Sequence, residues 1–86
     1  YPAEIEDVLH GHPDISEVAV VGVPDDTWGE RVKACVVPHE GTSLTEADIV
    51  GYVEERLADY KKPRELKLYD QLPRNPTGKV TKDQLT

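Results

Sequence analysis

One lysine of this chain stands in a segment whose composition could hold it rigidly for chemistry. The segment reads Leu72-Pro73-Arg74-Asn75-Pro76-Thr77-Gly78-Lys79-Val80, and its two prolines and one glycine exclude regular structure and stiffen the backbone. A P-loop would need a glycine five positions before Gly78 and a Ser or Thr after the lysine, but Pro73 and Val80 stand there. Lys79 is therefore a candidate for charge stabilisation outside a P-loop, with a solvated surface lysine as the alternative.

The basic residues of the chain are concentrated near Lys79. Residues 1–60 hold fourteen acidic and three basic residues, whereas residues 61–86 hold three acidic and seven basic ones. This asymmetry predicts that the C-terminal quarter faces an anionic ligand or an acidic neighbour, unless it is only a solvated basic surface. Nucleic acid is not an expected partner, because the net charge is −7 and no aromatic residues interleave with a basic stripe.

The other reactive side chains lack the partners that catalysis or metal binding requires. His10 and His12 face a turn without cysteines or clustered carboxylates, and His39 stands apart, so no metal site is predicted. Cys35 lies among valines with no histidine placed to activate it, which favours a small core residue over a nucleophile. A single cysteine also excludes an internal disulfide and fits a reducing, cytoplasmic compartment.

The length of the chain limits what it can do alone. Eighty-six residues make one domain with a thin core, and they could hardly enclose the roughly 300–1,000 Å³ of a small-molecule site. The chain begins at Tyr1 in an already helical pattern, with no signal peptide and no apolar stretch approaching the ~18 residues of a membrane span. We therefore expect residues 1–86 to be a single domain cut from a longer cytosolic protein.

Hydrophobic periodicity and turn residues predict the elements that must position Lys79. Thr45 is expected to cap a helix that Lys61-Lys62-Pro63 ends, and Thr81 with Gln84 resembles a capping box that opens another. The expected elements are a helix over 2–10, antiparallel strands over 15–23 and 31–37, a helix from 46 to 61–63, a strand over 65–70, the loop 72–80 and a helix from 81. The order α-β-β-α-β-loop-α predicts an α+β fold with a small mixed β-sheet packed by helices.

Four groups of residues, in order and at the expected spacing, resemble the C-terminal domain of the adenylate-forming (AMP-binding) superfamily. They are Pro2-Ala3-Glu4-Ile5-Glu6, Val23-Pro24-Asp25 with Trp28-Gly29-Glu30, Tyr60-Lys61 with Pro63, and Leu72-Pro73-Arg74 with Thr77-Gly78-Lys79. This superfamily includes acyl-CoA synthetases, luciferases and the adenylation domains of nonribosomal peptide synthetases. The resemblance covers essentially the whole chain, looks closest to bacterial fatty-acid and aryl-acid CoA ligases, and implies the mobile C-terminal domain of such an enzyme.

The resemblance implies a two-step reaction. A carboxylic acid, expected to be a fatty acid, attacks Mg·ATP to give an acyl-adenylate and pyrophosphate, and the thiol of coenzyme A then displaces AMP. Lys79 matches the family lysine that enters the site for the first step, where a compact ammonium can contact both carboxylate and phosphate oxygens. Mounting this lysine on a rotating domain lets it withdraw for the second step. Mg²⁺ is expected to be bound mainly by a large N-terminal domain.

The resemblance also suggests residues that contact coenzyme A. The run Lys61-Lys62-Pro63-Arg64 matches a stretch near the coenzyme nucleotide in some family members, so Lys62 and Arg64 are candidate phosphate-binding residues. Trp28 is a candidate for lining the approach of the pantetheine arm or its nucleotide. The alternatives are a solvated helix exit for the basic run and simple packing for Trp28.

Two other functions stay open at this stage. The same fold can load the thiol of a carrier protein in a modular synthetase, which a carrier domain soon after Thr86 would favour. An interaction module without catalytic parts, whose acidic residues 1–60 bind a basic partner, is the other alternative. The resemblance places the hinge and the large domain, with its ATP and acyl pockets, upstream of Tyr1. The segment is therefore expected to fold but to turn over nothing alone, and the acid cannot be identified from it.

Overall fold

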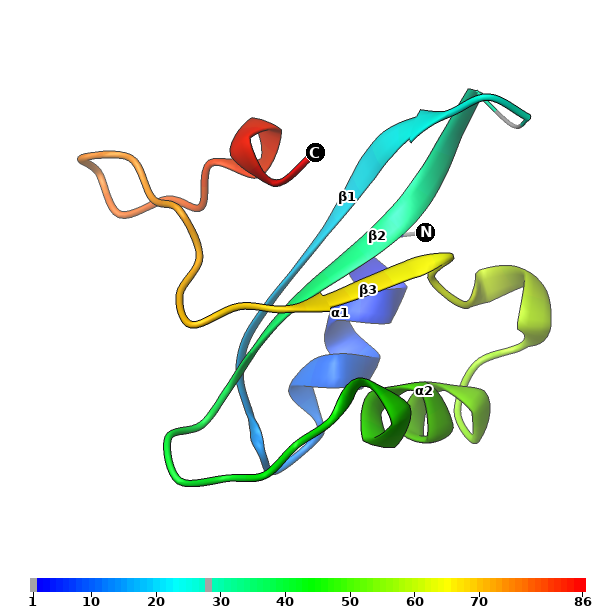
Figure 1. Ribbon diagram of the computed structural model, residues 1–86, viewed down its shortest axis with the longest axis horizontal. Helices are drawn as coiled ribbons and strands as arrows, with labels where there is room; N and C mark the ends of the chain where they lie inside the picture. The colour runs from blue at the N-terminus through cyan, green and yellow to red at the C-terminus, as the bar shows by residue number, and fades with distance from the viewer. Residues whose placement is uncertain (1, 28) are drawn as a thin grey trace.

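A three-stranded sheet forms the centre of the molecule (Figure 1). The computed structural model describes residues 2–27 and 29–86, with β1 (Ile15–Asp25) antiparallel to β2 (Gly29–Pro38) and β3 (Glu65–Leu68) parallel to β2. The predicted mixed sheet and the antiparallel pair are both confirmed. The first two strands run slightly beyond their predicted ranges, and the third ends at Leu68 instead of Asp70.

Both faces of the sheet are covered, which explains the continuous apolar runs in its first two strands. One face carries the helices α1 (Pro2–His10) and α2 (Glu46–Glu54), and the other carries the C-terminal segment with its 3₁₀ helix η2 (Lys82–Leu85). The buried residues on the helical face are Ile5, Leu9, Ile15, Val18, Val20, Ala34, Val36, Leu44, Ile49, Val53 and Leu57. Those on the opposite face are Ala19, Val21, Val23, Cys35, Val37, Leu72 and Leu85. Cys35 is therefore a core residue, as predicted.

Helix α2 begins where the sequence predicts. Thr45 is its N-cap residue, and the Thr45 hydroxyl accepts a hydrogen bond from the Asp48 amide (3.2 Å). In return, the Asp48 carboxylate accepts one from the Thr45 amide (3.0 Å), which completes a capping box. The hydrogen bonds from Thr45 lower the pKa of the Asp48 carboxyl.

The same helix ends earlier than predicted, at Glu54 instead of 61–63. The chain leaves the helix because Leu57 turns into the core and Ala58 adopts an extended conformation. A short 3₁₀ helix, η1 (Asp59–Lys61), then leads toward β3. Among the described residues, no helix has the length and apolar character needed to cross a membrane.

The C-terminal helix is a 3₁₀ turn instead of the predicted α-helix. The Gln84 amide donates to the Thr81 carbonyl (3.0 Å), and the Thr81 side chain makes no capping bond, so the predicted capping box is wrong. The Thr81 hydroxyl is buried without a hydrogen-bond partner among the described residues. The tighter turn results because Leu85 is drawn into the core and its carbonyl accepts a hydrogen bond from Lys33 on β2 (2.8 Å).

Candidate active site

A small hairpin near the C-terminus presents Lys79. Arg74 and Val80 pair as an antiparallel bridge, the Asn75 amide donates to the Lys79 carbonyl (2.9 Å), and the Gly78 amide donates to the Asn75 carbonyl (2.9 Å). Gly78 has a φ of 88°, a left-handed conformation that glycine adopts without steric cost. Asn, Pro and Gly at the first, second and fourth turn positions are the residues that a type I turn favours, so this turn is set by its own residues.

The side chain of Asn75 fills the inside of the turn. Its Oδ1 accepts hydrogen bonds from the Thr77 amide (3.0 Å), the Thr77 hydroxyl (2.7 Å) and the Lys79 amide (3.0 Å). Such contacts are the reason that asparagine is favoured in turns. The backbone nitrogen of Lys79 is therefore fixed by a side chain of the same turn.

Replacing Asn75 with alanine is expected to loosen this turn. The change removes an acceptor that serves three donors, and we expect the turn to lose about 1–2 kcal/mol of local stability, because a net hydrogen bond contributes about 1 kcal/mol. Amide exchange at Thr77 and Lys79 should then become about 5- to 30-fold faster. Asn75→Asp keeps an acceptor and is the matched control. Unchanged exchange in Asn75→Ala would show that the side chain does not hold the turn.

The stem of the hairpin is docked on the sheet face opposite the helices, and its tip projects away from the sheet (orange in Figure 1). Leu72 is buried on that face, and Val80 packs against the same cluster. Arg74 forms an ion pair with Glu17 of β1. Apolar packing and one ion pair therefore fix where the hairpin stands.

The side chain of Lys79 is exposed, and it makes no hydrogen bond or ion pair within residues 2–27 and 29–86. Its ammonium can bind an anionic group without first breaking an ion pair with a carboxylate of the described residues. A cation carried on a fixed backbone can stabilise negative charge that develops in a transition state, and this role requires neither a base nor a nucleophile beside it.

Lys62 and Arg64 lie in the segment between η1 and β3, across the molecule from the hairpin (Figure 1). The Lys62 Nζ is 3.0 Å from the Asp59 carboxylate and 3.7 Å from the Glu54 carboxylate. The hydrogen bond with Asp59 is the main cause that raises the pKa of Lys62. The structure therefore brings Lys62 and Arg64 into one basic segment and keeps them apart from Lys79.

A network of charged side chains lies beside Arg64. Arg31 on β2 donates to the Glu65 carboxylate on β3 from Nε (3.0 Å) and Nη2 (2.7 Å), and to the Pro24 carbonyl from Nη1 (2.6 Å). The Arg31 guanidinium holds the pKa of the Glu65 carboxyl below its usual range. The network ties the start of β3 to the end of β1. Trp28, the third candidate contact for coenzyme A, lies outside the described residues.

Lys33 is a buried lysine that the sequence reasoning missed, and it helps to place the hairpin. It is only 7% exposed, and its Nζ donates to the Tyr69 hydroxyl (2.8 Å) and the Leu85 carbonyl (2.8 Å), with a Glu65 carboxylate oxygen 3.8 Å away. The Tyr69 hydrogen bond raises the pKa of Lys33 and outweighs the opposing effect of burial. Lys33 thus connects β2 by hydrogen bonds to Tyr69, which precedes the hairpin in the sequence, and to Leu85, which follows it. Its position two residues before Cys35, at the start of the buried apolar part of β2, was the available signal.

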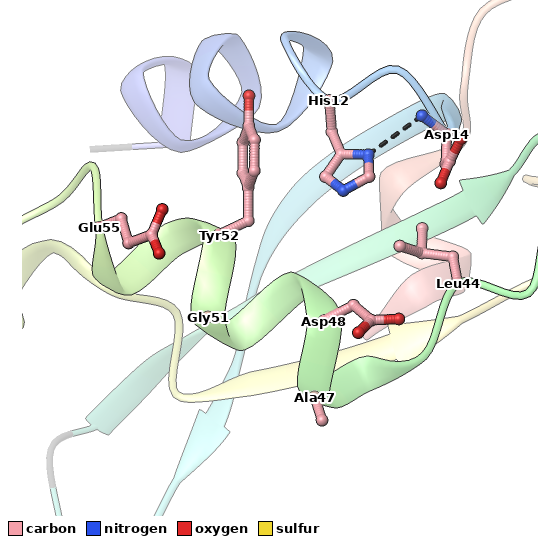
Figure 2. Close-up of a pocket in the computed structure, with 8 residues that line it drawn as sticks. All are labelled: His12, Asp14, Leu44, Ala47, Asp48, Gly51, Tyr52 and Glu55. Carbon is pink, nitrogen blue, oxygen red and sulfur yellow. Dashed lines mark hydrogen bonds between the residues drawn. The ribbon is translucent and has the colours of Figure 1, made fainter.

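An open groove of about 600 Å³ lies between the α1–β1 turn and α2 (Figure 2). The Tyr52 ring packs against the His12 ring there, with centroids 4.7 Å apart, and His12 Nδ1 accepts a hydrogen bond from the Asp14 amide (3.0 Å). The lining residues are His12, Asp14, Leu44, Ala47, Asp48, Gly51, Tyr52 and Glu55. None of the candidate residues is among them, and in the described part of the chain no three His, Cys, Asp or Glu residues are arranged to hold a metal ion.

The chain is similar to known proteins over nearly its whole length. The family model described as AMP-binding enzyme C-terminal domain matches residues 4–79. An indoleacetate–CoA ligase of Aromatoleum aromaticum is 52% identical over 85 residues, which are 99% of this chain and 17% of that protein. A fatty acid–[acyl-carrier-protein] ligase of Streptomyces coeruleorubidus is 45% identical over 85 residues, which are 99% of this chain and 16% of that protein.

A solved structure gives the same result for the fold. The Mycobacterium tuberculosis fatty acyl CoA synthetase matches with a TM-score of 0.87 and 49% identity, covering 99% of this chain and 17% of that one. The chain thus spans about 17% of the length of the relatives it matches. The matched residues end at Lys79 and so include the turn of the hairpin. The resemblance and the α+β fold predicted from the sequence are confirmed, and the chain belongs to the AMP-binding enzyme C-terminal domain family.

Proposed function

We propose that the chain is the C-terminal domain of a cytoplasmic, AMP-forming ligase that activates a carboxylic acid with ATP and transfers the acyl group to coenzyme A. The Lys79 hairpin carries the proposal, because a docked stem and a tight turn fix the backbone of an exposed lysine whose ammonium has no carboxylate partner among residues 2–27 and 29–86. Such a cation suits a step in which negative charge gathers where a carboxylate meets a phosphate. Membership of the AMP-binding family supports ATP as the activating substrate.

The partner of this domain is proposed to be a large N-terminal domain of the same protein. The relatives are about six times as long as this segment, and Lys79 needs a second surface to exclude water from the reacting groups. Binding of Mg²⁺, ATP and the acid is assigned mainly to that domain, which would make up most of a protein as long as the relatives. Lys79 would enter its site for adenylation and leave before transfer to the thiol.

The basic segment with Lys62 and Arg64 is proposed to meet the phosphates of coenzyme A in the second step. Its separation from the hairpin (Figure 1) supports a domain that presents two different surfaces in turn. Lys62 already contacts Asp59 and Glu54, so it must exchange these carboxylates for a phosphate. We therefore expect replacing Lys62 with alanine to slow acyl transfer to coenzyme A less than replacing Lys79 with alanine slows adenylation.

The acid is proposed to be a fatty acid, with an aryl acid as the alternative. Relatives named for each class exist, an indoleacetate–CoA ligase and a fatty acid–[acyl-carrier-protein] ligase. The second name also favours a different acceptor, the thiol of a carrier protein, as the alternative function. Selection of the acid is assigned to the large domain.

The full-length protein, supplied with Mg·ATP and a panel of fatty and aryl acids, tests this function. We expect AMP release and an acyl-CoA product for at least one acid, and much slower loading of a carrier protein. Faster loading of the carrier would select the alternative acceptor, and no AMP release with any acid would contradict the proposal. The segment of residues 1–86 alone is expected to fold, as followed by circular dichroism, and to release no AMP.

A further inference from the structure

The guanidinium of Arg74 connects the sheet to the peptide group that precedes Lys79. Its Nη2 donates to the Glu17 carboxylate on β1, and its Nη1 donates to the Gly78 carbonyl (2.7 Å). That carbonyl belongs to the peptide unit whose nitrogen is the Lys79 amide. A side chain fixed to the sheet at one end therefore contacts the backbone that carries the candidate catalytic lysine.

The Arg74 contacts are better suited to orienting the hairpin than to stabilising the fold. The Arg74 and Glu17 side chains are 45% and 31% exposed, and ion pairs that reach solvent add little to folding. The planar guanidinium offers donors in a fixed fork, so one arginine can serve a carboxylate and a carbonyl together, whereas a lysine ammonium cannot reproduce this geometry. The turn is held from inside by Asn75, and the Arg74 contact fixes the direction in which the turn points from β1.

We propose that Arg74 is a positioning residue for Lys79, and that Glu17 holds Arg74 in place for this task. The proposal rests on the proposed function of Lys79 in adenylation. Arg74 acts through the hairpin and not on the reacting groups. Its loss therefore lowers the rate of the adenylation step, and it leaves transfer from acyl-adenylate to coenzyme A unchanged because Lys79 has then withdrawn.

This role is tested by measuring the rates of the two half-reactions in the full-length protein. Arg74→Gln is made both in the parent protein and in the Lys79→Ala variant. In the parent, we expect the adenylation kcat to fall about 10- to 100-fold, as for a displaced catalytic group, with little change in the KM values for acid and ATP. Glu17→Gln should give a smaller loss of the same kind. In the Lys79→Ala background, Arg74→Gln should give no further loss, because the group that it positions is gone.

A matched control removes a different cation from the same segment. Lys82 pairs with Glu6 on α1 (3.5 Å), and its side chain makes no hydrogen bond to the hairpin backbone in the described part of the chain, so Lys82→Gln should leave both half-reactions unchanged. Arg74→Lys keeps the charge but not the fork, and it should resemble Arg74→Gln. An equal loss from Arg74→Gln in both backgrounds, or an equal loss in both half-reactions, would overturn the proposal.

Amide exchange separates a failure of this inference from a failure of the proposed function. In the full-length protein, Arg74→Gln should speed exchange at the Gly78 and Lys79 amides about tenfold, as expected for the loss of one charge-assisted hydrogen bond. If exchange does not change, Arg74 does not position the hairpin, whatever Lys79 does. If exchange speeds up but Lys79→Ala adenylates normally, the function proposed for Lys79 is wrong, and the role of Arg74 in adenylation is overturned with it.

Discussion

Replacing Lys79 with alanine in the full-length protein is expected to lower the rate of acyl-adenylate formation by about 10²–10³-fold, the usual cost of removing one preorganised donor. Transfer of the acyl group from preformed acyl-adenylate to coenzyme A should stay near the parent rate, because the proposed function has Lys79 leave the site before this step. The structure is consistent with this effect, because the ammonium is exposed and has no carboxylate partner within the described residues. Its full charge is available once a second domain excludes water.

Two separate assays distinguish the possible outcomes. Pyrophosphate release from acid and Mg·ATP measures the first step, and thioester formation from synthetic acyl-adenylate measures the second. Lys79→Arg is an informative companion, because it keeps the charge but replaces a compact ammonium with a broad planar group, and it should recover only part of the rate. Equal rates for Lys79→Ala and the parent in both assays would make Lys79 a solvated surface residue and refute its assignment.

Replacing Lys33 with methionine is expected to release the C-terminal segment from the sheet. The change removes the donor that pairs with the Tyr69 hydroxyl and the Leu85 carbonyl, and hydrogen bonds from a charged group contribute about 1.5–3 kcal/mol. We expect the segment to lose about 2–3 kcal/mol of local stability, so that amides of residues 81–86 exchange about 30- to 150-fold faster. Lys67→Met removes an exposed cation of β3 that also lies over the Tyr69 ring (5.2 Å from its centroid). Because Lys67 makes no described hydrogen bond to Leu85, this variant should change exchange little. Equal effects of the two variants would contradict the special role of Lys33.

The same contact predicts a dependence on alkaline pH. Because the pKa of Lys33 is raised in the folded state above its ordinary value of 10.5, the folded state holds this proton more tightly than the unfolded state. Its contribution to stability is therefore complete below the ordinary value and is lost as the pH rises through the raised one. Urea unfolding at pH values from about 8 upward should show a constant difference in stability between the parent and Lys33→Met below the ordinary value of 10.5. The difference should shrink only as the pH rises above that value.

Features governed by neighbouring residues were predictable from the sequence. Helix α1 occupies the predicted 2–10, and Thr45 caps α2 as predicted. The turn of the Lys79 hairpin could also have been predicted, since Asn, Pro and Gly stand at the positions that a type I turn favours. In each case the signal and its effect lie within a few residues of each other.

Features governed by distant contacts were not predictable. The end of α2 depends on the burial of Leu57 against the sheet, and the 3₁₀ turn at the C-terminus depends on Lys33, which is 52 residues from its partner Leu85. Arg74 lies 57 residues from Glu17. A charged residue in a single sequence carries no sign of which distant carboxylate or carbonyl it will meet, so the support of the Lys79 hairpin appears only in the structure.

The burial of Cys35 makes this segment convenient for site-directed labelling. Cys35 is its sole cysteine, it is fully buried beneath the C-terminal segment, and burial raises the pKa of its thiol. Maleimides react with thiolates, so Cys35 should stay unmodified while the protein is folded. A cysteine introduced at exposed Glu40 could then carry a fluorophore or spin label as the only probe on this segment. Distance changes to a probe elsewhere in the full-length protein would test whether the segment rotates between the two half-reactions. In an unlabelled sample, the rate at which Cys35 itself is modified would report how often its burial between the sheet and the C-terminal segment is lost.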